Sequence, residues 1–253
     1  MMNIKEPLHE LETSGGRYAF YYRPRGGDPL LRSNGERFSA ASVIKVPILL
    51  AWVWLEREGL LNKEAICNLD SEPEVHGAGF SWLLHQRQIP WHDVLLMMIS
   101  LSDNLCTNLV IGHIGLERLQ RTIKQNLGLG TTAVERKLMD FAAREAGQDN
   151  WIGAQDCVRF YDLLRQCRPE ERAWVDPLLA VCQDHTKLMR DVPFDSTSFY
   201  HKSGFIPEVV HDWGFTDKCD IFLLTQGYKD EARLLNIFGQ LGRLMETGEA
   251  VEF

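Results

Sequence analysis

The sequence predicts a mixed α/β fold in which an antiparallel sheet is flanked by helices and joined to an all-helical lobe. Strand-like alternation is confined to the two ends of the chain, and the middle has a helical pattern. Hydrophobic residues make up 45% of the 253 residues and charged residues 25%, which argues against a disordered or fibrous chain. Because end segments of this kind can pair in one sheet, we expect both termini in the same lobe.

The N-terminal segment predicts a short amphipathic helix followed by a strand. Residues 17–23 (RYAFYYR) alternate in polarity, are rich in aromatic side chains and follow two glycines, which is typical of a strand after a turn. We expect a hairpin through the sequence GGD at residues 26–28.

The middle of the chain predicts a series of helices. From residue 43 onward apolar side chains recur at helical spacing, and Gly, Pro or Asn residues separate the segments. The expected helices are residues 43–58, 92–100, 104–112, 116–127 and 153–166.

Strand character returns near the C-terminus, and the chain then closes with an amphipathic helix. The expected strands are residues 198–201, 209–216 and 219–226, and the expected helix is 229–245. We therefore assign residues 1–253 to a single domain. Its α/β lobe covers about 1–40 and 190–253, its helical lobe about 41–189, and a cleft lies between them.

Charge and hydropathy exclude several classes of partner. The formal net charge of −8 argues against nucleic acid as a partner. The first residues contain no apolar run of the kind found in secretory signals, and the longest apolar stretch, residues 46–55, is too short to span a bilayer. These features predict a cytoplasmic protein with no membrane partner, or a secreted or periplasmic one if an export signal has been removed.

Cysteine and histidine spacing gives no sign of a metal centre. The six cysteines are scattered without C-x-x-C spacing, and the eight histidines add no paired ligand spacing. We expect reduced thiols, no metal and no cofactor.

The most informative stretch is FSAASVIK at residues 38–45, where Ser42 opens an apolar helix and Lys45 follows one turn later. A serine needs a nearby base to attack an acyl carbon, and a lysine serves when burial and neighbouring cations lower its pKa. The helix start and the backbone N–H of Ser42 would stabilise an oxyanion. Taken alone, the pattern also fits a helix cap followed by a solvated lysine.

Two further polar segments interrupt the apolar pattern. Ser102-Asp103-Asn104 lies between two expected helices, and HKSG at residues 201–204 ends a strand-like segment. Glycine there would let a substrate backbone approach closely. Ordinary turn and strand-end residues explain each segment equally well on its own.

In this order the three segments resemble the S-x-x-K, S-D-N and K-T-G set of class A β-lactamases and penicillin-binding proteins. Ser102 follows Ser42 by 60 residues, the spacing of class A β-lactamases. VVHDWG at residues 209–214 resembles the strand after their third motif, and residues 10–21 resemble their opening helix and strand. The resemblance covers nearly the whole chain and implies a β-lactamase/transpeptidase-like fold.

The resemblance also implies roles for individual residues. Ser42 would be the nucleophile and Lys45 the general base of acylation. Ser102 would pass a proton to the departing nitrogen, and Lys202 would hold both Ser102 and a substrate carboxylate by charge.

Four residues would bind substrate by the same resemblance. Asn104 would bind an amide carbonyl of the substrate, and Ser203 stands in place of the K-T-G threonine. Gly204 would allow close approach, and Phe205 would supply a second oxyanion donor through its backbone N–H.

The chain departs from the family in the loop that carries the deacylating glutamate, which reads as arginine, any residue, glutamate, with an asparagine four positions later. Here Arg136 is followed by Leu138 in place of the glutamate and by Ala142 in place of the asparagine. The residue matching the aspartate that closes the loop is Asn150. Slow deacylation is therefore expected.

Asp140 is the nearest carboxylate that could replace the missing glutamate. Two residues along a helical turn rotate a side chain by about 200°, so Asp140 can serve only if the loop backbone differs. The alternative is a solvated or ion-paired loop acid near Arg136 or Arg144.

The leading hypothesis is a serine acyl-enzyme hydrolase that acts through Ser42 on a small molecule, either a β-lactam or a related amide or ester. Two alternatives stay open. One is an intracellular esterase or amidase with a substrate that is not a β-lactam, and the other is a penicillin-binding or sensing protein without turnover. The sequence predicts no oligomeric state.

Overall fold

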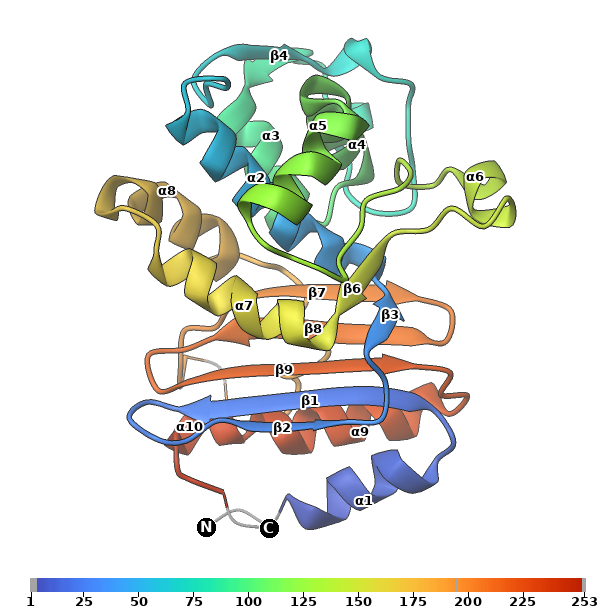
Figure 1. The fold of residues 1–253 in the computed structure, drawn as a ribbon, viewed down its shortest axis with the longest axis vertical. Helices are drawn as coiled ribbons and strands as arrows, with labels where there is room; N and C mark the ends of the chain where they lie inside the picture. The colour runs from blue at the N-terminus through green and yellow to red at the C-terminus, as the bar shows by residue number, and fades with distance from the viewer. Residues whose placement is uncertain (1–3, 194, 252–253) are drawn as a thin grey trace.

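A five-stranded antiparallel sheet forms one lobe of the molecule (Figure 1). The structure is a computed structural model, and it describes residues 4–193 and 195–251. Strands from the two ends of the chain pair directly, β1 against β9, as the alternation at both ends predicted. The strand order is β2-β1-β9-β8-β7, with bounds β1 Arg17–Pro24, β2 Leu30–Ser33, β7 Tyr200–Ile206, β8 Val209–Phe215 and β9 Cys219–Gln226.

Helices cover both faces of this sheet, and a group of helices forms the second lobe above it (Figure 1). On one face lie α1 (Lys5–Thr13), α9 (Glu231–Gly242) and α10 (Leu244–Thr247). The second lobe contains α2 (Lys45–Arg57), α3 (Trp91–Ser100), α4 (Asn104–Ile114), α5 (Leu116–Arg121) and the short α6 (Phe141–Glu145). Two further helices, α7 (Ala154–Arg165) and α8 (Pro169–Ala180), lie between that group and the sheet.

Short elements connect these parts. Strand β3 (Arg37–Ser39) pairs with β6 (Trp151–Gly153), and β4 (Ile66–Asn68) pairs with β5 (Gln88–Pro90). The remaining turns are 3₁₀-helical at η1 (Ala41–Ile44), η2 (Leu69–Ser71) and η3 (Ser81–Leu83), and π-helical at η4 (Thr122–Asn126). The strands β3, β4, β5 and β6 have only three residues each. They are too short to show a period of two, and the sequence did not predict them.

The alternation of β1 places its side chains in two separate cores. Tyr18, Phe20 and Tyr22 pack among the residues of α1 and α9, whereas Ala19 and Tyr21 join the larger core beneath the helical lobe. Successive strand residues point to opposite faces of a sheet. A strand covered by helices on both sides is therefore apolar at nearly every position, as β1 is.

Helix α2 is the central helix of the second lobe. Apolar side chains surround it on all sides, and ten of its residues are buried, including Lys45. A helix that is apolar all round is stable only inside the protein. Because α2 begins directly after η1, the buried helix holds both Ser42 and Lys45 in fixed positions.

Helix α7 packs directly on the sheet, so the helical stretch 41–189 is not confined to a separate lobe. The Tyr161 hydroxyl donates to the Gly214 and Ile221 carbonyls at 3.0 and 2.8 Å. The Trp213 indole N–H donates to the Cys157 carbonyl at 2.8 Å. The amphipathic face of α7 is thus buried against β8 and β9, which its periodicity alone could not locate.

Three other segments differ from the predicted elements. Strand β7 begins at Tyr200 and continues through Ile206 rather than ending at His201, because the ladder with β8 extends across the polar HKSG segment. The expected helix at 116–127 is α5 followed by the π-helical turn η4. Helix α8 was not predicted, since Pro169 starts it and Pro177 interrupts its pattern.

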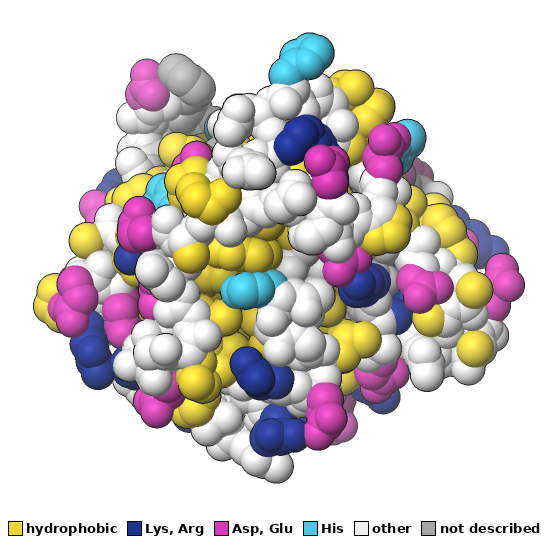
Figure 2. Space-filling model, turned by 90° about the horizontal axis from the view of Figure 1, so that it is seen from above, with side chains coloured by type: hydrophobic (Ala, Val, Ile, Leu, Met, Phe, Trp, Pro, Cys, Tyr) yellow, Lys and Arg dark blue, Asp and Glu magenta, His cyan; other side chains and the backbone are white. Residues whose placement is uncertain are grey.

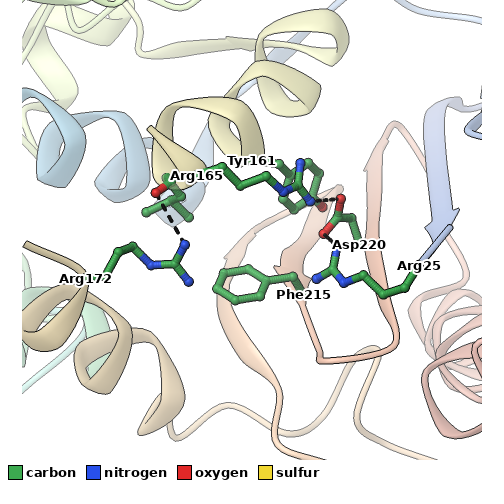
Figure 3. Close-up of a pocket in the computed structure, with 7 residues that line it drawn as sticks. Arg25, Tyr161, Arg165, Arg172, Phe215 and Asp220 are labelled. Atoms are coloured by element: carbon green, nitrogen blue, oxygen red, sulfur yellow. Dashed lines mark hydrogen bonds and ion pairs between the residues drawn. The ribbon is translucent and has the colours of Figure 1, made fainter. Parts of the chain in front are cut away.

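A buried carboxylate, Asp220, ties α7 and the first hairpin to the sheet (Figure 3). Its Oδ2 accepts from Arg23 at 2.6 Å and also from Arg165, and its Oδ1 accepts from Arg25 at 2.8 Å. Figure 3 shows Arg25 and Arg165 converging on Asp220 beside Phe215. All three arginine side chains stay partly exposed.

We expect Asp220→Asn to lower the free energy of unfolding by about 2–3 kcal/mol. Removing one partner from a buried pair costs about 3–5 kcal/mol, and the partial exposure of the arginines reduces that figure. Urea unfolding measures the change. Asp162→Asn is the matched control, because Asp162 pairs with Arg165 but is 48% exposed. Equal midpoints for the two variants would contradict this role of Asp220.

The surface above the helical lobe carries charges of both signs. Figure 2 shows Lys and Arg side chains interspersed with Asp and Glu side chains on this face.

Within residues 4–193 and 195–251, no helix is both long and apolar enough to cross a bilayer.

Candidate active site

Ser42 lies in η1, at a point where strand β7 passes very close to the backbone. A Cβ atom on Gly204 would lie 2.9 Å from the Ser42 nitrogen and 3.1 Å from the Val43 nitrogen. Only glycine permits this approach. The preceding residue, Ala41, has a positive φ of 44°, and strained backbone of this kind is concentrated at functional sites.

Lys45 is fully buried, and its side-chain nitrogen is surrounded by oxygen atoms. Nζ lies 3.1 Å from Ser42 Oγ and 2.9 Å from Ser102 Oγ. It also lies 2.6 Å from the Ser102 carbonyl and 3.1 Å from Asn104 Oδ1. The structure thus brings the predicted nucleophile and the predicted proton shuttle within hydrogen-bonding distance of the nitrogen of the predicted base.

The electrostatics of this position favour a neutral amine. Burial is the main cause that holds the pKa of Lys45 well below its usual range, and the nearby Lys202 ammonium lowers it further, against the opposing effect of Asp103. A neutral amine has a lone pair that can accept the Ser42 proton. The contact with Ser42 Oγ and the direction of this pKa shift are both those that a general base requires.

The Ser102-Asp103-Asn104 segment is locked by the buried carboxylate of Asp103. Asp103 accepts from the Ser81 backbone N–H and hydroxyl, each at 2.8 Å, and caps α4 through the Cys106 N–H at 2.9 Å. Ser102 has a positive φ of 57°. Asn104 Nδ2 donates to the His76 carbonyl at 3.0 Å, which joins α4 to the loop before η3.

Lys202 and Ser203 reach the same place from β7, and both are buried. Lys202 Nζ donates to the Ser203 carbonyl at 2.8 Å. Burial is the main cause that lowers the pKa of Lys202, and Cys182 and Asp184 oppose it. Among the described residues Lys202 and Ser102 share no direct hydrogen bond, although both line the same cleft.

These residues open onto a cleft of roughly 330 Å³, within the range of small-molecule sites. Phe205 lies at the cleft with its side chain about half exposed. The hollow in Figure 3 is a poorer candidate, because two of its arginines are already bound by Asp220. The cleft is lined by Ser42, Gly77, Ala78, Ser100, Leu101, Ser102, Cys182, Gln183, Asp184, Lys202, Ser203, Gly204 and Phe205.

A family model matches most of the sequence around this site. The model is that of the beta-lactamase enzyme family, and it matches residues 3–246. The chain belongs to the beta-lactamase enzyme family. No curated protein matches the chain.

Solved structures share the fold of this beta-lactamase family member over almost its full length. A beta-lactamase from Sphaerobacter thermophilus is 23% identical with a TM-score of 0.85, and the match covers 98% of each chain. A protein named PBP-A is 22% identical with a TM-score of 0.81, covering 96% of this chain and 94% of that one. A leucine-to-glutamate variant of PBP-A, solved as an acyl-enzyme complex with penicillin G, gives the same values.

In the loop that departs from the beta-lactamase pattern, hydrogen bonds to Asn108 hold the backbone of Leu138 in place. The Leu138 backbone N–H donates to Asn108 Oδ1 at 2.7 Å, and its carbonyl accepts from Asn108 Nδ2 at 3.1 Å. Its side chain is partly buried against the main core. Asp140 is exposed and caps α6 through the Ala143 N–H at 3.0 Å. Neither residue lines the cleft, so the structure does not bring Asp140 to Ser42.

The carboxylate that closes this loop is Asp149, and the sequence assignment of that position to Asn150 is corrected. Arg136 donates to Asp149 Oδ1 through Nε at 3.0 Å and Nη2 at 2.6 Å. Ser39 Oγ donates to Asp149 Oδ2 at 2.9 Å. Asn150 instead accepts the Glu135 and Arg136 backbone N–H groups. The sequence alone did not distinguish position 149 from position 150, because the assignment depends on the hydrogen bonds within the loop.

Sequence reasoning missed a buried layer of charge behind Lys202. His201 Nδ1 lies 2.9 Å from Asp212 Oδ1. Burial lowers the pKa of His201, but Asp212 and then Cys182 outweigh burial and raise that pKa to about 10. Burial raises the pKa of Cys182, but His201 and Lys202 outweigh it and lower that pKa to about 7. No spacing motif in the sequence joins these residues.

Asp184 is the second missed group, and it lines the cleft itself. Ser203 Oγ donates to Asp184 Oδ2 at 2.6 Å. No short motif links residues 184 and 203.

Within the described residues no group of three or more His, Cys, Asp or Glu side chains could hold a metal ion.

Proposed function

We propose that this protein is a serine acyl-enzyme hydrolase that acts on β-lactams or related small amides or esters through Ser42, with slow deacylation. One observation carries the proposal: a buried lysine nitrogen lies 3.1 Å from Ser42 Oγ and 2.9 Å from Ser102 Oγ. This arrangement supplies a nucleophile, a base and a path for the proton in a single contact group.

Acylation begins when neutral Lys45 removes the proton of Ser42. Ser42 Oγ then forms a bond to the acyl carbon of the substrate, and the carbonyl oxygen becomes an oxyanion. The backbone N–H groups of Ser42 and Phe205 would donate to that oxygen, where preorganised donors are most effective. The close passage of β7 at Gly204 supports this placement.

The leaving nitrogen requires a proton as its bond to the acyl carbon breaks. Ser102 is suited to deliver it, because its hydroxyl lies 2.9 Å from Lys45, which holds the proton taken from Ser42. Ser102 would then recover that proton from Lys45. Asn104 and Ser203 would bind the substrate on either side of the scissile bond.

Deacylation needs an activated water, and the loop lacks the groups that position one in class A enzymes. Leu138 and Ala142 carry no polar side-chain atoms, and Asp140 is exposed at the start of α6. The leucine-to-glutamate variant of PBP-A forms an acyl-enzyme with penicillin G, which supports this class of chemistry on the fold that the two proteins share. The absence of the water-positioning groups also favours penicillin capture as the second candidate function.

We expect Ser42→Ala to abolish covalent labelling by benzylpenicillin and by a nitrophenyl ester. Intact-protein mass spectrometry detects the adduct, and digest mapping locates it. Ser71→Ala is the control, since its hydroxyl is exposed and bonded to the Asn68 carbonyl away from the cleft. Undiminished labelling in Ser42→Ala would show that another residue is the nucleophile.

The choice of probe separates the candidate functions. Sustained hydrolysis of a chromogenic cephalosporin indicates a β-lactamase, and turnover of the nitrophenyl ester alone indicates an esterase. A stable adduct without turnover indicates a penicillin-binding protein.

A further inference from the structure

We propose that Asp184 sets substrate selectivity, so that the cleft disfavours compounds with a carboxylate beside the scissile bond and accepts neutral or cationic ones. This inference rests on the proposed function and names its substrate class. The observation behind it is that the hydroxyl of Ser203, the neighbour of the Lys202 that is expected to hold a substrate carboxylate, already donates to a carboxylate of the protein at 2.6 Å.

The loop that carries Asp184 is fixed on both sides. The Gln183 N–H donates to the Ser100 carbonyl at 3.0 Å, which ties the loop to the end of α3. The Leu188 N–H donates to the buried carboxylate of Asp212 at 3.2 Å. Asp184 Oδ1 itself accepts from the Thr186 hydroxyl at 2.6 Å. These bonds hold the carboxylate in place at the cleft.

Asp184 is ionised at neutral pH. Burial acts to raise the pKa of its carboxyl, but the Lys187 ammonium and the hydrogen bonds from Lys187, Ser203 and Thr186 together outweigh burial and hold that pKa below its usual range. Lys187 is only 5% exposed and does not line the cleft, whereas Asp184 is 34% exposed and does. An incoming ligand therefore meets the carboxylate, not its countercation.

The cation on this side of the cleft is Lys202, and it offsets little of the repulsion between Asp184 and a substrate carboxylate. Its side chain is buried, and Nζ already donates to the Ser203 carbonyl. A substrate carboxylate would have to displace Ser203 from Asp184 and then lie next to a like charge. Built-in repulsion of this kind is a common means of rejecting one ligand in favour of another.

Three probes that share the benzylpenicillin ring system and differ at the carboxyl group test the inference: the anionic benzylpenicillin, its neutral methyl ester and its cationic dimethylaminoethyl ester. The measured quantity is the second-order rate of Ser42 acylation, followed by intact-protein mass spectrometry. In the wild type we expect the methyl ester to react at least about tenfold faster than the acid, and the cationic ester faster still. Raising the ionic strength should narrow these ratios, because salt screens the repulsion.

Asp184→Asn keeps an acceptor for Thr186 but removes the charge, and we expect it to accelerate the acid about tenfold while slowing the cationic ester. Asp28→Asn is the matched control and should leave every ratio unchanged. Asp28 is an exposed acid in the β1–β2 turn, whereas Asp184 is bonded to β7, and β2 and β7 are the opposite edges of the sheet.

Each outcome decides between the proposals. If the acid reacts as fast as the methyl ester in the wild type, or if Asp184→Asn leaves the ratio unchanged, the inference is overturned. If no probe acylates Ser42 in any variant, the proposed function itself fails. If Asp184→Asn does not fold, Lys187→Gln provides the converse test, since an uncompensated Asp184 should slow the acid further and an unchanged ratio would again overturn the inference.

Discussion

Lys45→Arg is expected to slow acylation of Ser42 by about 10²- to 10⁴-fold, the usual contribution of a general base. Arginine has a similar length but does not lose its proton in the accessible pH range. The variant therefore carries a basic side chain that cannot accept the Ser42 proton. Mass spectrometry of the adduct formed with benzylpenicillin over time gives the rate.

The pH dependence of the wild-type rate provides a second measurement of the same role. The base must be neutral to act, so acylation should rise as the pH passes upward through the pKa of Lys45. Because burial and Lys202 lower that pKa, the rise should occur well below the pH at which an exposed lysine titrates. The Lys45→Arg variant should not show this rise of the acylation rate with pH.

A conservative change elsewhere controls for general damage. Lys137 forms an ion pair with Glu72 outside the cleft, so Lys137→Arg should acylate at the wild-type rate. An acylation rate for Lys45→Arg within a few-fold of wild type would remove Lys45 from the role of base.

Leu138→Glu is expected to have the second large effect, which is to speed deacylation. A missing general base forfeits about 10²- to 10⁴-fold in rate, or roughly 3–5 kcal/mol of barrier. Both backbone polar groups of Leu138 are bonded to Asn108, which fixes the backbone from which the new side chain would extend. Partial burial would raise the pKa of the introduced carboxyl and suit it to a base near neutral pH.

Stopped-flow absorbance with a chromogenic cephalosporin measures this effect. The wild type should show a burst of about one product per enzyme followed by slow release, and Leu138→Glu should shorten the slow phase without removing the burst. Asp140→Asn is the control and should change little, because Asp140 is exposed and caps α6 through the Ala143 N–H. Rapid wild-type hydrolysis without a burst would show that the deacylating groups lie elsewhere.

Local sequence was sufficient to predict the elements that carry the chemistry. The aromatic-rich segment 17–23 and the strand character of residues 219–226 indicated strands, and these segments pair in the structure. The apolar run after Ser42 indicated a buried helix with Lys45 one turn along. Such patterns are readable because a helix and a strand each repeat over a few residues.

The surroundings of Lys45 could not be read in this way. Three of the four oxygens around its nitrogen come from residues 102 and 104, which local periodicity does not connect to residue 45. The match to a motif set suggested that these segments meet, but their distances and the lowered pKa follow only from the packing of α2 against the α3–α4 turn and β7.

What the sequence determined by itself was the set of candidate catalytic residues, the helical and strand segments that carry them, and the leucine at position 138 in place of a glutamate. Only the tertiary structure decided that Asp149 closes the loop, that Asp140 is capping a surface helix, and that Asp184 occupies the hydroxyl of Ser203. The physical reason is that hydrogen bonds and ion pairs depend on where the chain path brings side chains together, whereas periodicity records only which face of one element is apolar.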